Sequence, residues 1–264
     1  MRPVLFSVGD LHVGTHDFFV LLGVAAATAV FLFEARRRRV LGEDLLWVVV
    51  GTLFCGAIAA KAGGLWNLVS DTGGPGSAAE TIARGGRTIL GGLAGAYLGA
   101  VTTKRIVGYR AKTGDLFAPA VALGMAVGRW GCFLTEQVGT TTSMPWGITV
   151  SDAAAARIPD CAACTTGLPM HPSFLYEIAF HALAFGVLVR NRDRIPVPGE
   201  LLKIYLFAYA VFRFGVEFVR GNDVVVAGLT RSQLFLIPSA LLLGGYLVRQ
   251  IRRGAYGRLE VATT

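Results

Sequence analysis

Seven long apolar runs constrain this chain more than any other feature of its sequence. A helix that crosses a membrane needs about 20 mostly apolar residues. The chain has 53% hydrophobic and only 16% charged residues, whereas soluble domains average about 25% charged residues. The sequence therefore predicts an all-α, polytopic membrane protein with seven transmembrane helices. The runs cover residues 17–34, 45–63, 88–103, 116–134, 172–189, 200–218 and 232–248.

Basic residues follow the first, third, fifth and seventh runs, which places them in alternate loops on one side of the membrane. The positive-inside rule makes that side cytoplasmic, so we expect the N-terminus outside and the C-terminus in the cytoplasm. The net charge of +8 then reflects membrane topology and does not indicate a nucleic-acid partner, because these loops are short and adjoin apolar runs. The residues are Arg36, Arg37, Arg38, Arg39, Lys104, Arg105, Arg110, Lys112, Arg190, Arg192, Arg194, Arg249, Arg252, Arg253 and Arg258.

Seven spans in a chain of this length leave room for a single membrane domain, residues 1–264. Two outer loops, at about 64–87 and 135–171, are long enough to form substructure. The second loop contains Cys161 and Cys164. Outside the cytoplasm this spacing favours a disulfide, since a metal site would need two further ligands.

Three glycines recur at intervals of four in the third run, at Gly91, Gly95 and Gly99. Small residues at this spacing let two membrane helices approach closely. We expect this stripe to serve helix packing.

Ionisable residues in the apolar runs are the strongest functional signal. Each costs about 2.5–3.5 kcal/mol at a membrane centre, and such residues usually face the bundle interior and mark function. Arg213 and Glu217 are four residues apart and share a helix face, as do Glu177 and His181. With the topology above, these polar groups lie toward the outer side. The set comprises Asp17, Arg87, Arg129, Glu177, His181, Arg213, Glu217 and Arg220.

Two interpretations of this set stay open. In the first, the charges only neutralise one another, with Arg213 and Glu217 as the obvious pair. In the second, they form an anion site, because the four arginines outnumber the acids Asp17, Glu177 and Glu217. The planar fork of arginine suits phosphate, and the abundant phosphate at this depth is a phospholipid headgroup. The second interpretation predicts an anionic phospholipid site that opens to the outer half of the bilayer.

Short motifs along the chain resemble those of one family of membrane enzymes. Residues 128–136 read G-R-W-G-C-F-L-T-E and resemble its signature G-R-x-G-N-F-x-x-x-E. Residues 171–177 are similar to H-P-x-x-L-Y-E, and residues 213–220 to R-F-x-x-E-x-x-R. Residues 85–92 match G-G-x-S-x-H-G-G in part, and P-W-G-I at 145–148 looks like the segment after the signature. The chain thus resembles the prolipoprotein diacylglyceryl transferases over nearly its whole length.

The resemblance implies that the chain transfers a diacylglyceryl group from phosphatidylglycerol to the thiol of a lipobox cysteine in prolipoproteins. The implied partners are phosphatidylglycerol, lipobox-containing prolipoproteins and membrane lipids, with no metal and no cofactor. The implied location is the bacterial plasma membrane, with the active site toward its outer face.

The motifs also imply roles for individual residues. Arg129 and Arg213 would stabilise the leaving phosphate, and Glu217 or His171 would accept the thiol proton. His16 and Asp17 are further candidates for the proton acceptor. The predicted substrate-binding residues are Arg87, Arg220, Tyr176, Glu177, Asp17, Cys132 and Glu136.

Three positions depart from the family pattern. Leu90 stands where the family has a histidine, Cys132 where it has an asparagine and, in a looser alignment, Asp17 where it has a tyrosine. Because Leu90 cannot accept a proton, either another group does so, or the chain is a divergent branch with altered chemistry or acceptor. The rival interpretation is a non-catalytic phospholipid-binding protein or transporter. Polar residues on one side only favour the enzyme over a transporter, which would expose polar groups to both sides in turn.

Overall fold

Seven long helices dominate the computed structural model, which describes residues 4–8, 11–72, 89–136, 138–155, 164 and 167–256. Each helix overlaps one of the predicted apolar runs, so the mostly helical class is confirmed. Five of them are long and apolar enough to cross a membrane: α1, the first 22 residues of α2, α5, α7 and α9. The helices are α1 (Thr15–Arg37), α2 (Glu43–Thr72), α4 (Ile89–Ile106), α5 (Gly114–Thr135), α7 (Ser173–Asn191), α8 (Glu200–Glu217) and α9 (Arg231–Arg252).

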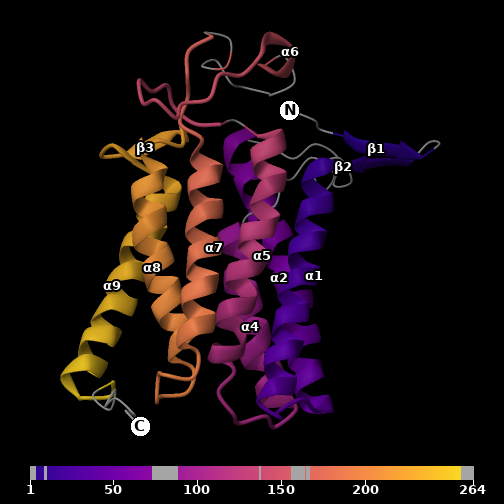
Figure 1. Ribbon diagram of the computed structural model, residues 1–264, viewed down its shortest axis with the longest axis vertical. Coiled ribbons are helices and arrows are strands. Elements are labelled where there is room, and N and C mark those ends of the chain that lie inside the picture. Colours follow the sequence, from indigo (N-terminus) through magenta and orange to yellow (C-terminus); the bar gives the residue numbers. More distant parts are fainter. Residues whose placement is uncertain are drawn as a thin grey trace. The chain divides into compact units, whose positions relative to one another are not determined.

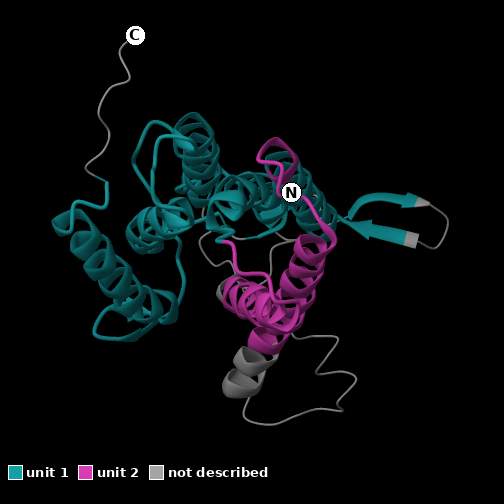
Figure 2. Ribbon diagram, turned by 90° about the horizontal axis from the view of Figure 1, so that it is seen from below, with its two compact units in different colours: residues 1–34, 112–264 teal, residues 35–111 magenta. Residues whose placement is uncertain are grey.

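The chain divides into two compact units (Figure 2). Unit 2, residues 35–111, consists of the end of α1 together with α2 and α4. In unit 2 the helices α2 and α4 meet at small residues. A Cβ added at Gly95 would overlap Ala59 and the carbonyl oxygen of Cys55, and one at Gly99 would overlap Gly51 and Cys55. The predicted packing role is therefore confirmed at Gly95 and Gly99. Helix α2 continues to Thr72, past the end of the predicted run.

Unit 1, residues 1–34 and 112–264, contains the predicted site. In this unit α5 packs against α7 and α8, and α9 packs against α8 (Figure 1). Helix α1 approaches α5 closely at Gly23, where an added Cβ would lie 2.6 Å from the carbonyl oxygen of Gly124. A second close approach joins Gly131 of α5 to the backbone of His16. These two contacts bring the start of α1 beside the end of α5.

The described residues between α5 and α7 form a small cap in unit 1 that includes the short helix α6 (Asp152–Ala155). Its core consists of Val138, Val150, Ala154, Ala155, Cys164 and Met170. Cys164 is disulfide-bonded, and Cys161 lies outside the described residues. The amide of His171 donates to Thr140 O (2.9 Å), and that of Thr140 to Val219 O (2.9 Å). The cap thereby links the start of α7 to the segment after α8.

Two antiparallel hairpins accompany the helices of unit 1, and the sequence patterns did not predict them. Strands β1 (Val4–Val8) and β2 (Leu11–Gly14) precede α1. Strands β3 (Val224–Val226) and β4 (Leu229–Thr230) join α8 to α9. They are too short for a period-2 pattern to stand out between apolar helices.

Candidate active site

Glu177 is the centre of a buried charge cluster in unit 1. Its side chain is fully buried in the first turns of α7. Oε2 forms an ion pair with the Arg129 guanidinium of α5. Oε1 accepts a 2.8 Å hydrogen bond from Arg220 Nη1 and lies 3.9 Å from Arg213 Nε of α8. One carboxylate therefore contacts three arginines, which come from two other regions of the chain.

Phe174 supports the same arginines with its ring. It lies three residues before Glu177, on the same face of α7, and is 1% exposed. The guanidinium carbon of Arg220 lies 4.2 Å from the ring centroid, and that of Arg129 lies 5.9 Å from it. Because a cation within about 6 Å of an aromatic face is attracted to it, Phe174 holds both guanidinium groups beside Glu177.

Glu217 fixes Arg213 from the other side. Its carboxylate forms an ion pair with Arg213, and Oε1 also accepts hydrogen bonds from Asn222 Nδ2 (2.7 Å) and Thr230 Oγ1 (2.8 Å). Thr230 in turn caps the N-terminus of α9 in a capping box. Glu217 is thus held by one cation and two neutral donors, which orient it toward Arg213 and join α8 to α9.

Arg129 retains donor capacity after its contacts are made. Its Nη2 donates to the Tyr209 hydroxyl at 3.2 Å and forms the ion pair with Glu177 Oε2. Its Nε–H is buried and has no hydrogen-bond partner among the described residues. A buried donor left unpaired costs about 1–3 kcal/mol. This N–H is therefore available to an acceptor that enters the cluster.

A second group of side chains adjoins the arginines. Glu136 follows α5, and its Oε2 lies 3.6 Å from Arg220 Nη2. Its Oε1 lies 3.5 Å from His16 Nε2, which is 3.7 Å from Cys132 Sγ. The substrate-binding candidates Glu136 and Cys132 are thus brought close to Arg220. Glu136 follows Phe133 by three residues, one fewer than in the signature it resembles.

The remaining predicted site residues lie apart from this centre or outside the described residues. His171 Nδ1 lies 3.1 Å from the Tyr176 hydroxyl, which also accepts a 2.8 Å hydrogen bond from Trp146 Nε1. The side chain of Asp17 is 57% exposed and lies 4.0 Å from His16. Arg87 and the side chain of Leu90 are outside the described residues.

Two features of the charged residues depend on how the helices pack. Glu177 and His181 share a face of α7, but His181 Nδ1 pairs with the Tyr205 hydroxyl at 2.9 Å, while Glu177 contacts the arginines. The predicted surplus of arginines counts Arg87, which lies outside the described residues. The three described arginines face three carboxylates, because Glu136, which was not counted among the acids, lies beside Arg220.

Sequence reasoning missed three supporting side chains, namely Phe174, Tyr209 and Thr230. Tyr205, Tyr209 and Arg213 recur at intervals of four on α8, so their shared face could have been recognised. The contact of Thr230 with Glu217 could not, because it depends on the β3–β4 hairpin.

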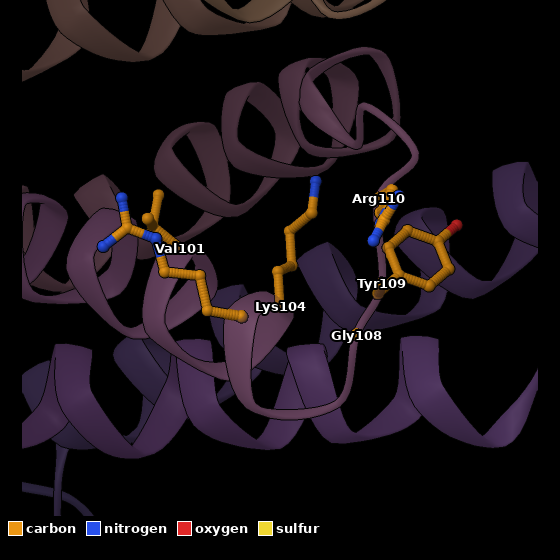
Figure 3. A pocket seen from close by; sticks show the side chains of 6 residues that line it. Val101, Lys104, Gly108, Tyr109 and Arg110 are labelled. Atoms are coloured by element: carbon orange, nitrogen blue, oxygen red, sulfur yellow. The ribbon is translucent and has the colours of Figure 1, made fainter.

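Unit 2 has a separate cationic cavity of about 430 Å³ (Figure 3). Lys104 points to the carbonyl oxygen of Ala111 and lies 5.5 Å from the Tyr109 ring centroid. Burial, and then the charge of Asp44, raise the pKa of Tyr109. None of the predicted site residues lines this cavity. Its lining comprises Val101, Lys104, Arg105, Gly108, Tyr109 and Arg110.

Apolar helices that enclose arginines and glutamates at one end of unit 1 define a helical membrane protein with a buried, charged site. Taking ions out of water costs several kcal/mol each, so such a cluster is weak as a device for stability and typical of function. Residues 3–249 match the family described as prolipoprotein diacylglyceryl transferase. The chain belongs to this family.

Named relatives agree with the family match. The chain is 29% identical over 258 residues to a phosphatidylglycerol–prolipoprotein diacylglyceryl transferase of Finegoldia magna, covering 94% of this chain and 95% of the relative. It is 32% identical over 248 residues to a protein of the same name from Gloeobacter violaceus, covering 91% of this chain and 89% of the relative. A Lactobacillus delbrueckii subsp. bulgaricus protein of that name is 26% identical over 254 residues, with 92% and 90% covered.

Proposed function

We propose that this chain transfers a diacylglyceryl group from phosphatidylglycerol to the cysteine thiol of prolipoproteins. The relatives' names specify this lipid donor and this class of acceptor. The observation that carries the proposal is the convergence of Arg129, Arg213 and Arg220 on Glu177. These groups are preorganised where a lipid phosphate would develop charge.

The reaction makes two demands. As the thiol sulfur attacks the glycerol carbon, the carbon–oxygen bond breaks and its electron pair stays on the departing glycerol phosphate. Fixed cations help only if they bind this developing charge more strongly than the starting lipid. Arg129 meets this demand, because its Nε–H is unpaired among the described residues until an acceptor arrives. Arg213 and Arg220 complete a cationic wall around the phosphate.

The second demand is a thiolate, since a free thiol has a pKa of about 8.5. Glu217 already accepts hydrogen bonds from Asn222 and Thr230 and pairs with Arg213. These contacts favour a role in positioning Arg213 over a role as the proton acceptor. His171 faces Tyr176, and we assign this pair, with Trp146, to substrate positioning.

We further propose a single membrane domain in which all seven long helices cross the bilayer, with the N-terminus outside. Helices α4 and α8 then join the five spans that are apolar by composition. Helix α8 carries Glu200, Arg213 and Glu217, which are buried in partnered clusters, and Lys203, which pairs with Glu200. This arrangement supports the place of α8 in the membrane. The arginine cluster would face the outer leaflet of the bacterial plasma membrane.

A transfer assay tests the proposal. The purified protein is incubated with labelled phosphatidylglycerol and a lipobox peptide, beside an Arg129→Ala variant. We expect thioether-linked peptide and released glycerol phosphate from the native chain, and a loss of at least about 100-fold in the variant. Lipid binding without transfer, at the level of the variant, would support a non-catalytic lipid-binding protein instead.

Leu90 supplies a second test, because it stands where the family resemblance places a histidine. The native chain and a Leu90→His variant are each expressed in a transferase-deficient strain. We expect both to restore growth. Rescue by Leu90→His alone would show that the native chain does not perform the ordinary reaction.

A further inference from the structure

Three potential metal ligands meet where α1 begins and α5 ends. Cys132 and Glu136 are four residues apart along the chain, and His16 lies across from both. One ligand atom from each residue lies within 4.8 Å of the other two. Cys132 is buried, while His16 and Glu136 are partly exposed, so an ion could enter from the solvent side.

The distances in this group can be compared with those of hydrogen bonds and with those between ligands of a metal ion. His16 Nε2 lies 3.5 Å from Glu136 Oε1 and 3.7 Å from Cys132 Sγ. The Cys132 thiol and the His16 imidazole are within range of a hydrogen bond to sulfur. The histidine and glutamate are farther apart than a good N–H···O hydrogen bond of about 2.7–3.2 Å. In a tetrahedral zinc site with Zn–N of about 2.05 Å and Zn–S of about 2.3 Å, the N–O edge is about 3.4 Å and the N–S edge about 3.6 Å. The two observed distances match these edges, and the third edge, from Cys132 Sγ to the Glu136 carboxylate, is at most 4.8 Å.

Packing holds the three residues in this arrangement. A Cβ added at Gly131 would lie 3.0 Å from the carbonyl oxygen and 3.1 Å from the Cα of His16. The absence of a side chain at Gly131 therefore lets the His16 backbone come against α5. This close approach places the imidazole beside Cys132, the next residue along the helix.

Outer partners of two candidate ligands are also present. Asp17 Oδ1 lies 4.0 Å from Nδ1 of His16, the ring nitrogen that faces away from the cluster. The other carboxylate oxygen of Glu136 faces Arg220 at 3.6 Å. Ligating histidines usually present their second nitrogen to a carboxylate or carbonyl, and such partners orient the ligands. Glu136 would therefore connect the metal to the arginine cluster.

We propose that His16, Cys132 and Glu136 bind a zinc ion whose fourth position takes the sulfur of the acceptor cysteine. Thiolate, imidazole and carboxylate are the ligands zinc prefers, and three protein ligands leave a catalytic site open. The metal site stands on the geometry alone, whereas its role in thiol activation rests on the proposed function.

The chemistry at this site balances without a further reactant. A zinc ion held by these residues would promote loss of the acceptor thiol's proton to solvent, because a coordinating thiol is deprotonated. The sulfur then forms a bond to the glycerol carbon of the lipid. The bond from that carbon to the phosphate oxygen breaks, and its electron pair leaves with glycerol phosphate beside Arg129 and Arg213. Zinc activation removes the need for a base at the position of Leu90.

Metal content is measured on the full chain, purified in detergent without a histidine tag and without reductant, so that Cys164 stays in its disulfide. We expect about one zinc per chain, removable by a chelator, and a thiolate-to-cobalt absorption band after Co²⁺ replaces it. Cys132→Ser should abolish the band, and His16→Ala should lower zinc content at least tenfold. Cys55→Ser and His12→Ala, matched substitutions outside the cluster, should bind as the native chain does.

Metal content and transfer separate this inference from the proposed function. No zinc above the level of Cys132→Ser, or a cobalt spectrum without a thiolate band, overturns the site. Full transfer by metal-free protein overturns the role in thiol activation. Zinc binding with no transfer at any metal content leaves the site standing and contradicts the proposed function.

Discussion

Helix α8 has a buried charge cluster at each of its ends, and the two are built differently. At its start, the fully buried Glu200 accepts hydrogen bonds from Lys203 (2.6 Å), Tyr246 (2.7 Å) and Tyr256 (2.8 Å). Burial, and then the hydrogen bond to Glu200, raise the pKa of Tyr256, so the phenol stays a donor. One carboxylate is there matched by one cation and two neutral hydroxyls.

The cluster near the other end of α8 lies about 20 Å away. It has three arginines on Glu177 and Glu217, and the Arg129 Nε–H has no hydrogen-bond partner among the described residues. The difference teaches that burial of charge alone does not mark a site. The Glu200 network links α8 to α9, and none of its buried polar atoms is unpaired among the described residues, whereas the Glu177 cluster includes the unpaired Arg129 Nε–H.

Arg129→Lys should give the largest loss of transfer activity. Lysine keeps the charge but loses the planar fork, so we expect the transfer rate to fall about 100- to 1,000-fold. Arg192→Lys is the matched control, because Arg192 pairs with Glu34 away from the cluster. Its rate should stay within about twofold of native, measured with labelled phosphatidylglycerol. Equal losses in both variants would contradict the assignment of Arg129.

Glu177→Gln and Glu200→Gln compare the central carboxylates of the two clusters. Glu177→Gln leaves buried arginines uncompensated, so we expect it to lower the free energy of unfolding by about 3–5 kcal/mol. Glu200→Gln leaves only the partly exposed Lys203 without its partner, so we expect a smaller loss of about 1–3 kcal/mol. Thermal unfolding in detergent checks this. Glu177→Gln should also cut the transfer rate of the folded protein at least tenfold, whereas Glu200→Gln should not. A large rate loss in Glu200→Gln would erase the distinction between the ends.

Tyr209→Phe and Tyr256→Phe each remove one hydroxyl group, the first from the Glu177 cluster and the second from the Glu200 network. Tyr209 accepts from Arg129, and Tyr256 donates to Glu200. Each change should cost about 1–2 kcal/mol of stability, again by thermal unfolding. Only Tyr209→Phe should also slow transfer, by about threefold to tenfold, because it loosens the Arg129 guanidinium, which we propose binds the lipid phosphate. If Tyr256→Phe slowed transfer equally, the Glu200 network would have to be part of the site.

Gly131→Ala should have the smallest effect. The new methyl group must push against the His16 backbone, so we expect a stability loss of about 1 kcal/mol. Gly186→Ala on α7 is the control, since its Cβ would meet nothing within 4 Å. Alanine there should stabilise the helix by about 0.5–1 kcal/mol. A stabilising Gly131→Ala would show that α1 and α5 can separate at this position without cost.

The sequence was sufficient for the helices, because each long helix coincides with an apolar run that can be recognised from neighbouring residues alone. Helix α8, for example, was expected at 200–218 and runs from Glu200 to Glu217. The β3–β4 hairpin was missed, since two strands of three and two residues carry too little pattern.

The side-chain contacts of the site were predictable only where both residues of a pair lie on the same helix. Arg213 and Glu217 pair as their spacing of four indicates. Glu177 and His181 have the same spacing, but His181 pairs with Tyr205 of another helix. The role of Glu177 as the common partner of three arginines depends on how α5, α7 and α8 pack, and no local pattern encodes that.

Photocrosslinking tests most directly whether the arginine cluster binds the lipid phosphate. Phosphatidylglycerol with a photoreactive group in its headgroup is incorporated into bilayer discs with the native chain, and crosslinked peptides are identified by mass spectrometry. We predict crosslinks in residues 129–136 and 209–220, lost in Arg129→Lys. Crosslinks concentrated at the cationic cavity of residues 101–110, or around Glu200, and unchanged in Arg129→Lys, would contradict the account.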